Sequence, residues 1–222
     1  MRTFNRETTV GTASLHEAAG KVGALPATIR SIHPGMRVIG PALPVRGPSG
    51  DNLWLHRAIY AADRGDVLVV DTGPGCEYGY WGEVMTVAAQ QRGIAGLVIT
   101  GGIRDSAQLI AAGFPTFAGA ISVRGTTKNP DGDGAVGAAV RIGDVTVRRG
   151  DLVLADDDGV VVLPAGDAAR AIAAAEQRDL AEVGIVARLR GGETTIDIYG
   201  LPTENTRPGQ SPFERRDHAD EG

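Results

Sequence analysis

The sequence is poor in lysine and cysteine, and it has no long apolar run. Only Lys21 and Lys128 are lysines among the 22 basic residues, so few side chains are available to form a Schiff base. Cys76 is the single cysteine, which excludes an intramolecular disulfide and a cluster of thiolate ligands. No stretch approaches the roughly 18 apolar residues of a membrane span, and the opening MRTFNRETTV has no signal-peptide core. We therefore expect a cytoplasmic protein without a membrane segment.

Basic residues are also outnumbered by acidic ones. The 27 acidic and 22 basic residues give a formal net charge of −5, and no segment gathers Arg or Lys into a stripe. Direct binding of nucleic acid needs such a basic surface, so we expect no nucleic-acid partner. With 222 residues, 42% of them apolar, the chain can bury one sizeable core. We expect one domain over residues 1–200 and a polar tail over 201–222.

Helical and strand patterns alternate in the first half of the chain. Ser14-Leu15-His16-Glu17 has the form of a capping box and predicts a short helix over 14–22. Apolar runs further along predict the strands 37–45, 67–70, 96–100 and 115–119, separated by the helices 52–63, 82–92 and 105–112. Such alternation is typical of a parallel sheet with helices outside it.

The second half has a different character. After Arg124, short apolar segments are separated by Gly-Asp, Arg-Gly-Asp and Asp-Gly turns, which predicts a β meander. The run from Asp156 to Gly159 is typical of a hairpin turn and not of a metal cage, because its acids precede a glycine at a chain reversal. An Ala-rich helix is predicted from about 166 to 190, ending at Gly191-Gly192. The fold class is α/β, with a parallel-strand core, a β meander and a C-terminal helix.

A glycine-rich loop follows the predicted strand 67–70. Gly73, Gly75 and Gly79 have the spacing G-x-G-x-x-x-G, one residue longer than a dinucleotide-binding fingerprint. The next predicted strand ends in Thr100, where a ribose-binding acid would be needed. The loop therefore argues against a nucleotide cofactor and against methyl transfer from a nucleotide-like donor. Cys76 in the same loop has no nearby histidine and is interpreted as an ordinary loop thiol.

Two predicted helix starts, Gly82-Glu83 and Arg104-Asp105, lie just beyond the ends of predicted strands. Ligands of open α/β sheets bind at the carboxyl ends of the strands. Arg104 provides a planar fork for a substrate carboxylate. The first turn of the 82–92 helix has unpaired backbone N–H groups that could hold the same anion, those of Gly82, Glu83, Val84 and Met85.

The acids at these helix starts suit a hard cation. Asp105 offers a direct ligand for Mg²⁺ or Mn²⁺, and Glu83 could hold one of the waters such an ion keeps. Two structural alternatives stay open, because Asp105 before Ser-Ala-Gln-Leu also suits a helix N-cap and Arg104 could form only an ion pair with Glu83. Lys128 lies in a predicted loop, where it is either a surface lysine or a group that approaches a second substrate carboxylate.

The segment 81–118, WGEVMTVAAQQRGIAGLVITGGIRDSAQLIAAGFPTFA, resembles the core of a known enzyme family. The family contains the aldolases for 4-hydroxy-4-methyl-2-oxoglutarate and 4-carboxy-4-hydroxy-2-oxoadipate, together with the regulators of RNase E activity (RraA). Its signature is an acid after Gly, twenty intervening residues and then Arg-Asp, matched here by Glu83, residues 84–103 and Arg104-Asp105. The likeness also includes 124–130, 148–164 and 191–200, and so covers most of residues 10–200.

The resemblance implies a swivelling β/β/α domain that assembles as a homotrimer or hexamer, with sites between subunits. It also implies that Asp105 binds Mg²⁺ or Mn²⁺ directly and Glu83 binds it through water. Arg104 would grip the keto-acid and stabilise the pyruvate enolate, while residues 82–85 hold its carboxylate. An acid from a neighbouring subunit's C-terminal helix would complete the site, with Glu182 as the nearest candidate and Glu176 as the other.

The implied reaction is retro-aldol cleavage of a 4-hydroxy-2-keto diacid to pyruvate, together with decarboxylation of oxaloacetate. Both reactions leave the same enolate. The alternative that the family offers is a non-catalytic regulator that binds an RNA-degrading endonuclease. A label of quinone methyltransferase, attached to some similar sequences, is not supported by the glycine-rich loop over 73–79.

Overall fold

Four apolar segments form parallel strands, as their alternation with helices predicts. The computed structural model describes residues 7–73, 75 and 77–202. Within it the parallel strands are β2 (Val38–Arg46), β3 (Val67–Asp71), β5 (Gly96–Ile103) and β6 (Thr116–Ile121). Three short strands flank them, β1 (Arg30–Ser31) beside β6, β4 (Gly79–Trp81) beside β5, and β7 (Ala135–Val136) beside β2. The expected α/β core is confirmed.

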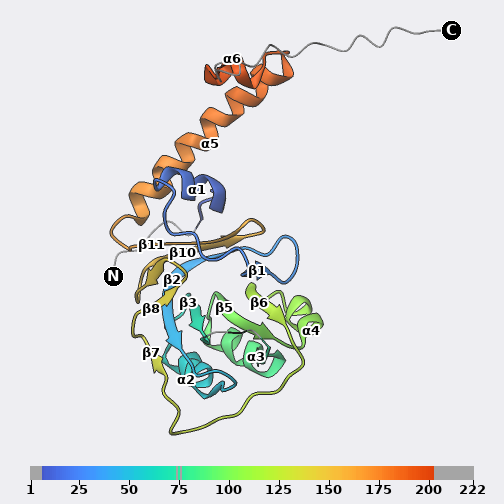
Figure 1. The fold of residues 1–222 in the computed structure, drawn as a ribbon, viewed down its shortest axis with the longest axis vertical. Coiled ribbons are helices and arrows are strands. Elements are labelled where there is room, and N and C mark those ends of the chain that lie inside the picture. Colours follow the sequence, from blue (N-terminus) through green and yellow to red (C-terminus); the bar gives the residue numbers. More distant parts are fainter. Residues whose placement is uncertain (1–6, 74, 76, 203–222) are drawn as a thin grey trace, which may run out of the picture. The chain divides into compact units, whose positions relative to one another are not determined.

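Three helices cover one face of these strands (Figure 1). They are α2 (Leu53–Ala61), α3 (Glu83–Arg92) and α4 (Ser106–Ala111). Side chains alternate along each strand, so that Leu68 and Val70 join the cluster under these helices, whereas Val67 and Val69 join a second cluster on the other face. Because both faces of β3 are buried, its residues 67–70 form a continuous apolar run.

The long strand β2 belongs to both halves of the sheet. Its residues 42–46 pair in parallel with β3, and its residues 38–41 pair antiparallel with β10 (Leu152–Asp156). β10 continues into β11 (Gly159–Leu163), and β8 (Val140–Ile142) with β9 (Val145–Val147) forms a separate hairpin. The expected meander is therefore confirmed, and two of its strands extend the main sheet.

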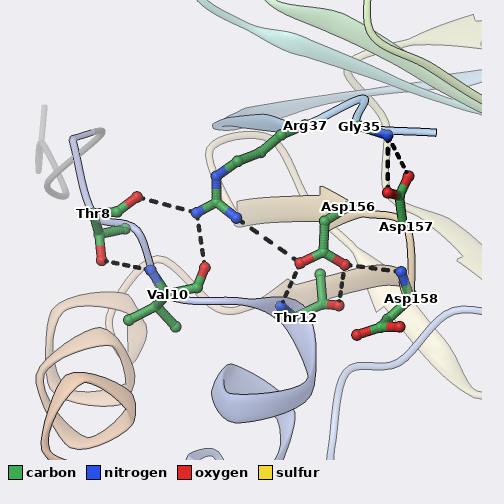
Figure 2. A network of polar contacts seen from close by, with 8 residues as sticks. All are labelled: Thr8, Val10, Thr12, Gly35, Arg37, Asp156, Asp157 and Asp158. Atoms are coloured by element: carbon green, nitrogen blue, oxygen red, sulfur yellow. Dashed lines mark hydrogen bonds and ion pairs between the residues drawn. The ribbon is translucent and has the colours of Figure 1, made fainter. Parts of the chain in front are cut away.

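The hairpin between β10 and β11 turns at Asp157-Asp158, as its sequence predicts. Asp156 at the end of β10 also anchors the first helix, α1 (Thr12–Ala18), because its carboxylate accepts the Thr12 N–H (2.8 Å) and the Thr12 hydroxyl (2.5 Å). Figure 2 shows Arg37 beside the same carboxylate, with Nη1 at 3.8 Å, donating to the backbone carbonyls of Thr8 and Val10.

The capping box expected at Ser14 is wrong. The helix begins at Thr12. Its N-cap residue is Gly11, which has no side chain to accept a helical N–H. The acceptor for the first turn is instead Asp156, 144 residues further along the chain. A local sequence pattern cannot reveal a cap that tertiary contacts provide.

Replacing Asp156 by Asn is expected to lower the free energy of unfolding by about 1–3 kcal/mol, the usual cost of breaking charge-assisted hydrogen bonds in a half-buried network. The amide nitrogen would face the N–H of either Thr12 or Asp158, both of which now donate to this carboxylate. Urea denaturation measures the change. Asp158→Asn is the matched control, because among the described residues its own carboxylate accepts no hydrogen bond. Equal stability of the two variants would contradict the role given to Asp156.

The C-terminal helix α5 (Ala168–Arg190) confirms the Ala-rich pattern. Contacts divide the chain into two compact units, residues 1–178 and 179–222, each described by itself. In the first unit, buried residues of α5 pack in one cluster with residues of α1 and β11. In the second, α6 (Thr195–Tyr199) is capped by Thr194, whose hydroxyl accepts the Asp197 N–H at 3.1 Å.

The single domain expected over residues 1–200 stays a prediction. Of the expected tail, 203–222 lie outside the described residues, and so does Cys76. Across the part of the chain that the structure describes, no helix combines the length and apolar character needed to cross a membrane.

Candidate functional site

The two helix starts singled out in the sequence lie side by side because the strands before them pair. β4 runs parallel to β5 with Trp81 opposite Ile103, and the Arg104 N–H donates to the Trp81 carbonyl at 2.8 Å. Gly82-Glu83 follows β4, and Arg104-Asp105 follows β5. The sequence predicts a loop over 72–80, so β4 itself was missed. Its pairing is what brings the two segments to one edge of the sheet.

Asp105 turns its carboxylate away from its own helix. It occupies the N-cap position of α4 but makes no side-chain cap, and its Oδ2 instead accepts the Glu83 N–H at 3.1 Å. Its backbone is left-handed, with φ +54° and ψ +39°, a conformation that costs free energy for any residue with a Cβ. Asp105 is thus the N-cap residue of α4 by position, but its side chain does not cap that helix. Residues held in this way cluster at functional sites, where the surrounding structure fixes them.

Arg104 lies beside this carboxylate. Its Nε is 3.8 Å from Asp105 Oδ2, and the two side chains are 49% and 39% exposed. Among the described residues Arg104 forms no ion pair with Glu83, so the alternative of a simple Glu83–Arg104 pair is wrong. Glycine at position 82 lets this carboxylate approach closely, because a Cβ there would lie 2.4 Å from Asp105 Oδ2 and 3.2 Å from Arg104 Cγ. The guanidinium and the carboxylate thus share one open face of the protein.

A buried hydrogen-bond chain fixes the turn into α3. The Thr86 N–H and hydroxyl both donate to the Gly82 carbonyl, at 3.0 and 3.1 Å, and Trp81 Nε1 donates to the Thr86 hydroxyl at 2.8 Å. The first-turn N–H groups of Val84 and Met85 have no acceptor within a helix. The Glu83 N–H is already taken by Asp105, so it is not one of the free donors that the sequence suggests. Val84 is 80% exposed, whereas Met85 is buried.

Asn52 borders the site from the side of α2, and sequence reasoning missed it. Its Nδ2 donates to the Tyr80 carbonyl at 2.9 Å and contacts Met85 Sδ at 3.6 Å. Its Oδ1 is the one buried side-chain oxygen or nitrogen of the described residues that lacks a hydrogen-bond partner. A buried acceptor without a donor is costly, which is typical of a group reserved for a ligand or water. The signal in the sequence was an Asn at the first position of the predicted helix 52–63.

Lys128 lies near the start of α2 as well. The Asn52 N–H donates to the Thr127 carbonyl at 3.1 Å, which places the Lys128 turn beside this helix. The pKa of His56 is lowered, first by burial and second by the positive charge of Lys128. The loop lysine of the sequence is therefore close to the Asn52 side of the site.

Of the other acids considered in the sequence, three are held in other parts of the first unit. Glu176 on α5 accepts a hydrogen bond from the Thr8 hydroxyl at 3.0 Å, and Glu182 belongs to the second unit. Asp156 and Asp157 are held by the N-terminal segment and by the Gly35 N–H, as Figure 2 shows. Over 7–73, 75 and 77–202, no three or more His, Cys, Asp or Glu side chains form a group that could enclose a metal ion.

A family model described as RraA-like, Aldolase/RraA, matches residues 12–162, which include every residue of this site. The chain belongs to the RraA-like family. A relative from Halalkalibacterium halodurans, provisionally named a 4-hydroxy-4-methyl-2-oxoglutarate aldolase, is 35% identical over 158 residues, covering 71% of this chain and 74% of the relative.

Two solved structures share the fold of this chain. The RNA-processing inhibitor RraA from Thermus thermophilis has a TM-score of 0.64 and 27% identity, over 71% of this chain and 94% of that one. A protein from Geobacillus kaustophilus, titled S-adenosylmethionine: 2-dimethylmenaquinone methyltransferase, has a TM-score of 0.62 and 31% identity, over 69% and 94%. The names of these similar proteins thus cover three different activities.

The donors of this RraA-like site suit a hard divalent cation with several waters. Mg²⁺ is commonly held by one or two carboxylates while it keeps part of its hydration shell, so a cage of three acids is not required. Asp105 Oδ2 is held by the Glu83 N–H, and no described residue donates to Oδ1. The missing Cβ of Gly82 allows this carboxylate to lie against the start of α3. The exposed Glu83 side chain lies one helix start away and suits an outer-sphere contact through water.

Proposed function

We propose that the chain is a divalent-metal-dependent pyruvate aldolase. It cleaves a 4-hydroxy-2-keto diacid of the 4-hydroxy-4-methyl-2-oxoglutarate type and also decarboxylates oxaloacetate. The observation that carries this proposal is the Asp105 carboxylate turned onto the Glu83 N–H, with the Arg104 guanidinium beside it. The site therefore combines an anionic ligand for a cation with a fixed positive group for an oxyanion.

In the proposed cleavage, the 4-hydroxyl gives its proton to a water molecule, the bond between C3 and C4 breaks, and C4 becomes the carbonyl carbon of the second product. The electron pair of that bond passes to the 2-keto group, which gives the enolate of pyruvate, and C3 is then protonated. Arg104 donates hydrogen bonds to the oxygen on which negative charge grows. The N–H groups of Val84 and Met85, at the positive end of α3, bind the C1 carboxylate. Loss of CO₂ from oxaloacetate uses the same groups.

Asp105 would hold Mg²⁺ or Mn²⁺ directly, and Glu83 would hold it through a water molecule. Such an ion would act as a Lewis acid toward the 2-keto oxygen. Asp105 has a second task in this proposal, since its hydrogen bond from the Glu83 N–H fixes the α3 start relative to the carboxylate.

We also propose that the protein assembles as a homotrimer or hexamer, with an acid such as Glu182 reaching a neighbouring site. Support comes from the apolar side chains left exposed near the site, because Val84 is 80% and Val123 is 93% exposed. Light scattering coupled to size-exclusion chromatography would measure the mass. A monomer at micromolar concentration would contradict this part of the proposal.

Pyruvate release tests the reaction directly. Purified protein is mixed with oxaloacetate or with 4-hydroxy-4-methyl-2-oxoglutarate, and pyruvate is followed by coupling to lactate dehydrogenase and NADH. We expect turnover with Mg²⁺ or Mn²⁺ and its loss on addition of EDTA, restored by excess metal. A blank with metal but without protein corrects for spontaneous decarboxylation. Turnover that persists in EDTA would contradict the metal dependence.

A second candidate function is inhibition of an RNA-degrading endonuclease by direct binding. The likeness to the Thermus RNA-processing inhibitor favours it. The same assay distinguishes the two functions when it is paired with a binding measurement against such an endonuclease. Absence of pyruvate release together with tight binding would favour the regulator.

A further inference from the structure

Asp51 is a buried carboxylate that the proposed reaction does not use. It is 3% exposed and lies just before α2. Burying a carboxylate is costly unless hydrogen bonds replace its water. Its surroundings therefore indicate what the charge is retained for.

Three donors surround the Asp51 carboxylate, and two of them belong to residues on either side of Lys128. The Thr127 hydroxyl donates at 3.1 Å and the Asn129 N–H at 2.5 Å, while the Leu53 N–H donates to the other oxygen at 2.8 Å. The Thr127 N–H also donates to the Gly50 carbonyl at 2.8 Å. One buried charge thus joins the start of α2 to the exposed turn that carries Lys128.

The turn is held close to the first turn of α3. The Asn52 N–H donates to the Thr127 carbonyl, and the Asn52 amide contacts Met85 Sδ, whose residue belongs to that first turn. The positive charge of Lys128 is one cause of the lowered pKa of His56 on α2, second to burial. Lys128 therefore lies on the Asn52 side of the site, while Arg104 and Asp105 lie beyond Glu83 on the other side.

We propose that Asp51 is a positioning residue that holds Lys128 in place to bind the second carboxylate of a keto diacid. This inference rests on the proposed function, in which Arg104 and the α3 start take the keto-acid end. A diacid has a second negative charge, and a lysine that is held in one position binds it without the entropy cost of ordering a free loop. The only other lysine, Lys21, pairs with Glu17 at the far end of α1.

Binding of unreactive ligands tests the inference without any turnover. 2-Oxoglutarate has both carboxylates but no 4-hydroxyl to cleave, and pyruvate has only the keto-acid end. Isothermal titration calorimetry with Mn²⁺ present measures the Kd of each. We expect Lys128→Ala to raise the Kd for 2-oxoglutarate about tenfold, the effect of losing one charge-assisted hydrogen bond, and to leave the Kd for pyruvate unchanged.

Asp51→Asn should act in the same direction, because an amide in place of one oxygen opposes the Asn129 N–H. In the double variant with Lys128→Ala we expect no further loss, since Asp51 acts through that lysine. If Asp51→Asn fails to fold, Thr127→Val removes one of the same hydrogen bonds and should reproduce the effect, and Thr127→Ser should restore tight binding. Asp131→Asn, in the same loop, is the matched control and should bind both ligands as the unaltered protein does.

Several outcomes would overturn the inference. If the increases in the Kd for 2-oxoglutarate from the two single substitutions multiplied in the double variant, Asp51 would act independently of Lys128. An equal loss of pyruvate and 2-oxoglutarate binding would mean that the variants damage the whole site. Failure of the unaltered protein to bind 2-oxoglutarate would exclude a diacid subsite. The variants could bind 2-oxoglutarate selectively more weakly while the unaltered protein releases no pyruvate. That result would support the role of Asp51 and refute the aldolase reaction, so the two failures are distinguishable.

Discussion

Arg104→Ala is expected to lower kcat for pyruvate release by about 10²- to 10³-fold, as removal of a fixed oxyanion donor does in other enzymes. The guanidinium is the positive group next to Asp105 Oδ2, and its side chain is half exposed. Its loss should therefore leave the fold intact. The lactate dehydrogenase assay gives kcat and KM, and circular dichroism with a thermal melt checks the fold.

Two further variants serve as comparisons for Arg104→Ala. Arg104→Lys keeps the charge but not the planar fork, so we expect partial activity. Arg92→Ala removes an arginine from the last turn of α3, at the other end of the helix from Glu83, and should leave kcat unchanged. Full activity of Arg104→Ala would show that the oxyanion is stabilised elsewhere and would refute the proposed mechanism.

Asp105→Asn should abolish metal-dependent turnover and weaken Mn²⁺ binding by more than about 100-fold, beyond the 10- to 100-fold typical of losing an outer-shell partner. The change removes the charge but keeps a residue that tolerates a left-handed backbone, since Asn adopts φ near +54° more readily than most residues. Electron paramagnetic resonance of free Mn²⁺ gives the affinity independently of the reaction.

Asp105→Ala shows the effect of the left-handed backbone separately from the effect of the lost charge. It should lose metal in the same way and in addition be less stable, by about 1 kcal/mol, because Ala with φ > 0 is disfavoured. Asp144→Asn, at an exposed acid in the β8–β9 turn, is a control for the change of net charge. Mn²⁺ affinity that is equal in Asp105→Asn and the unaltered protein would place the ion elsewhere.

The fold could be predicted from the sequence wherever the spacing of apolar residues determines the secondary structure. The runs at 67–70 and 97–99 are apolar throughout because both faces of their strands are buried, and helix periodicity located α2. The exact limits were less accessible. β5 runs on to Ile103 through a register shift after Ile99, and the glycines at 101 and 102 gave no strand signal.

The site was accessible only in part. Spacing and resemblance selected Glu83, Arg104 and Asp105, and paired strands do bring these residues together. No sequence pattern could tell whether the Asp105 carboxylate caps its own helix or reaches the neighbouring one, because both need the same residue at the same place. Asn52 and Asp51 were missed for a similar reason. Their significance lies in burial and in partners on Tyr80 and Thr127, which are distant in the sequence.

The link between Thr12 and Asp156 has a consequence for synthesis on the ribosome. α1 has only seven residues, too few for a helix to be stable alone in water. Its anchoring carboxylate leaves the exit tunnel 144 residues after Thr12. The N-terminal segment must therefore wait, unstructured and open to chaperones or proteases, until most of the nascent chain has emerged. A segment translated long before Asp156 is thus among the last parts to be secured.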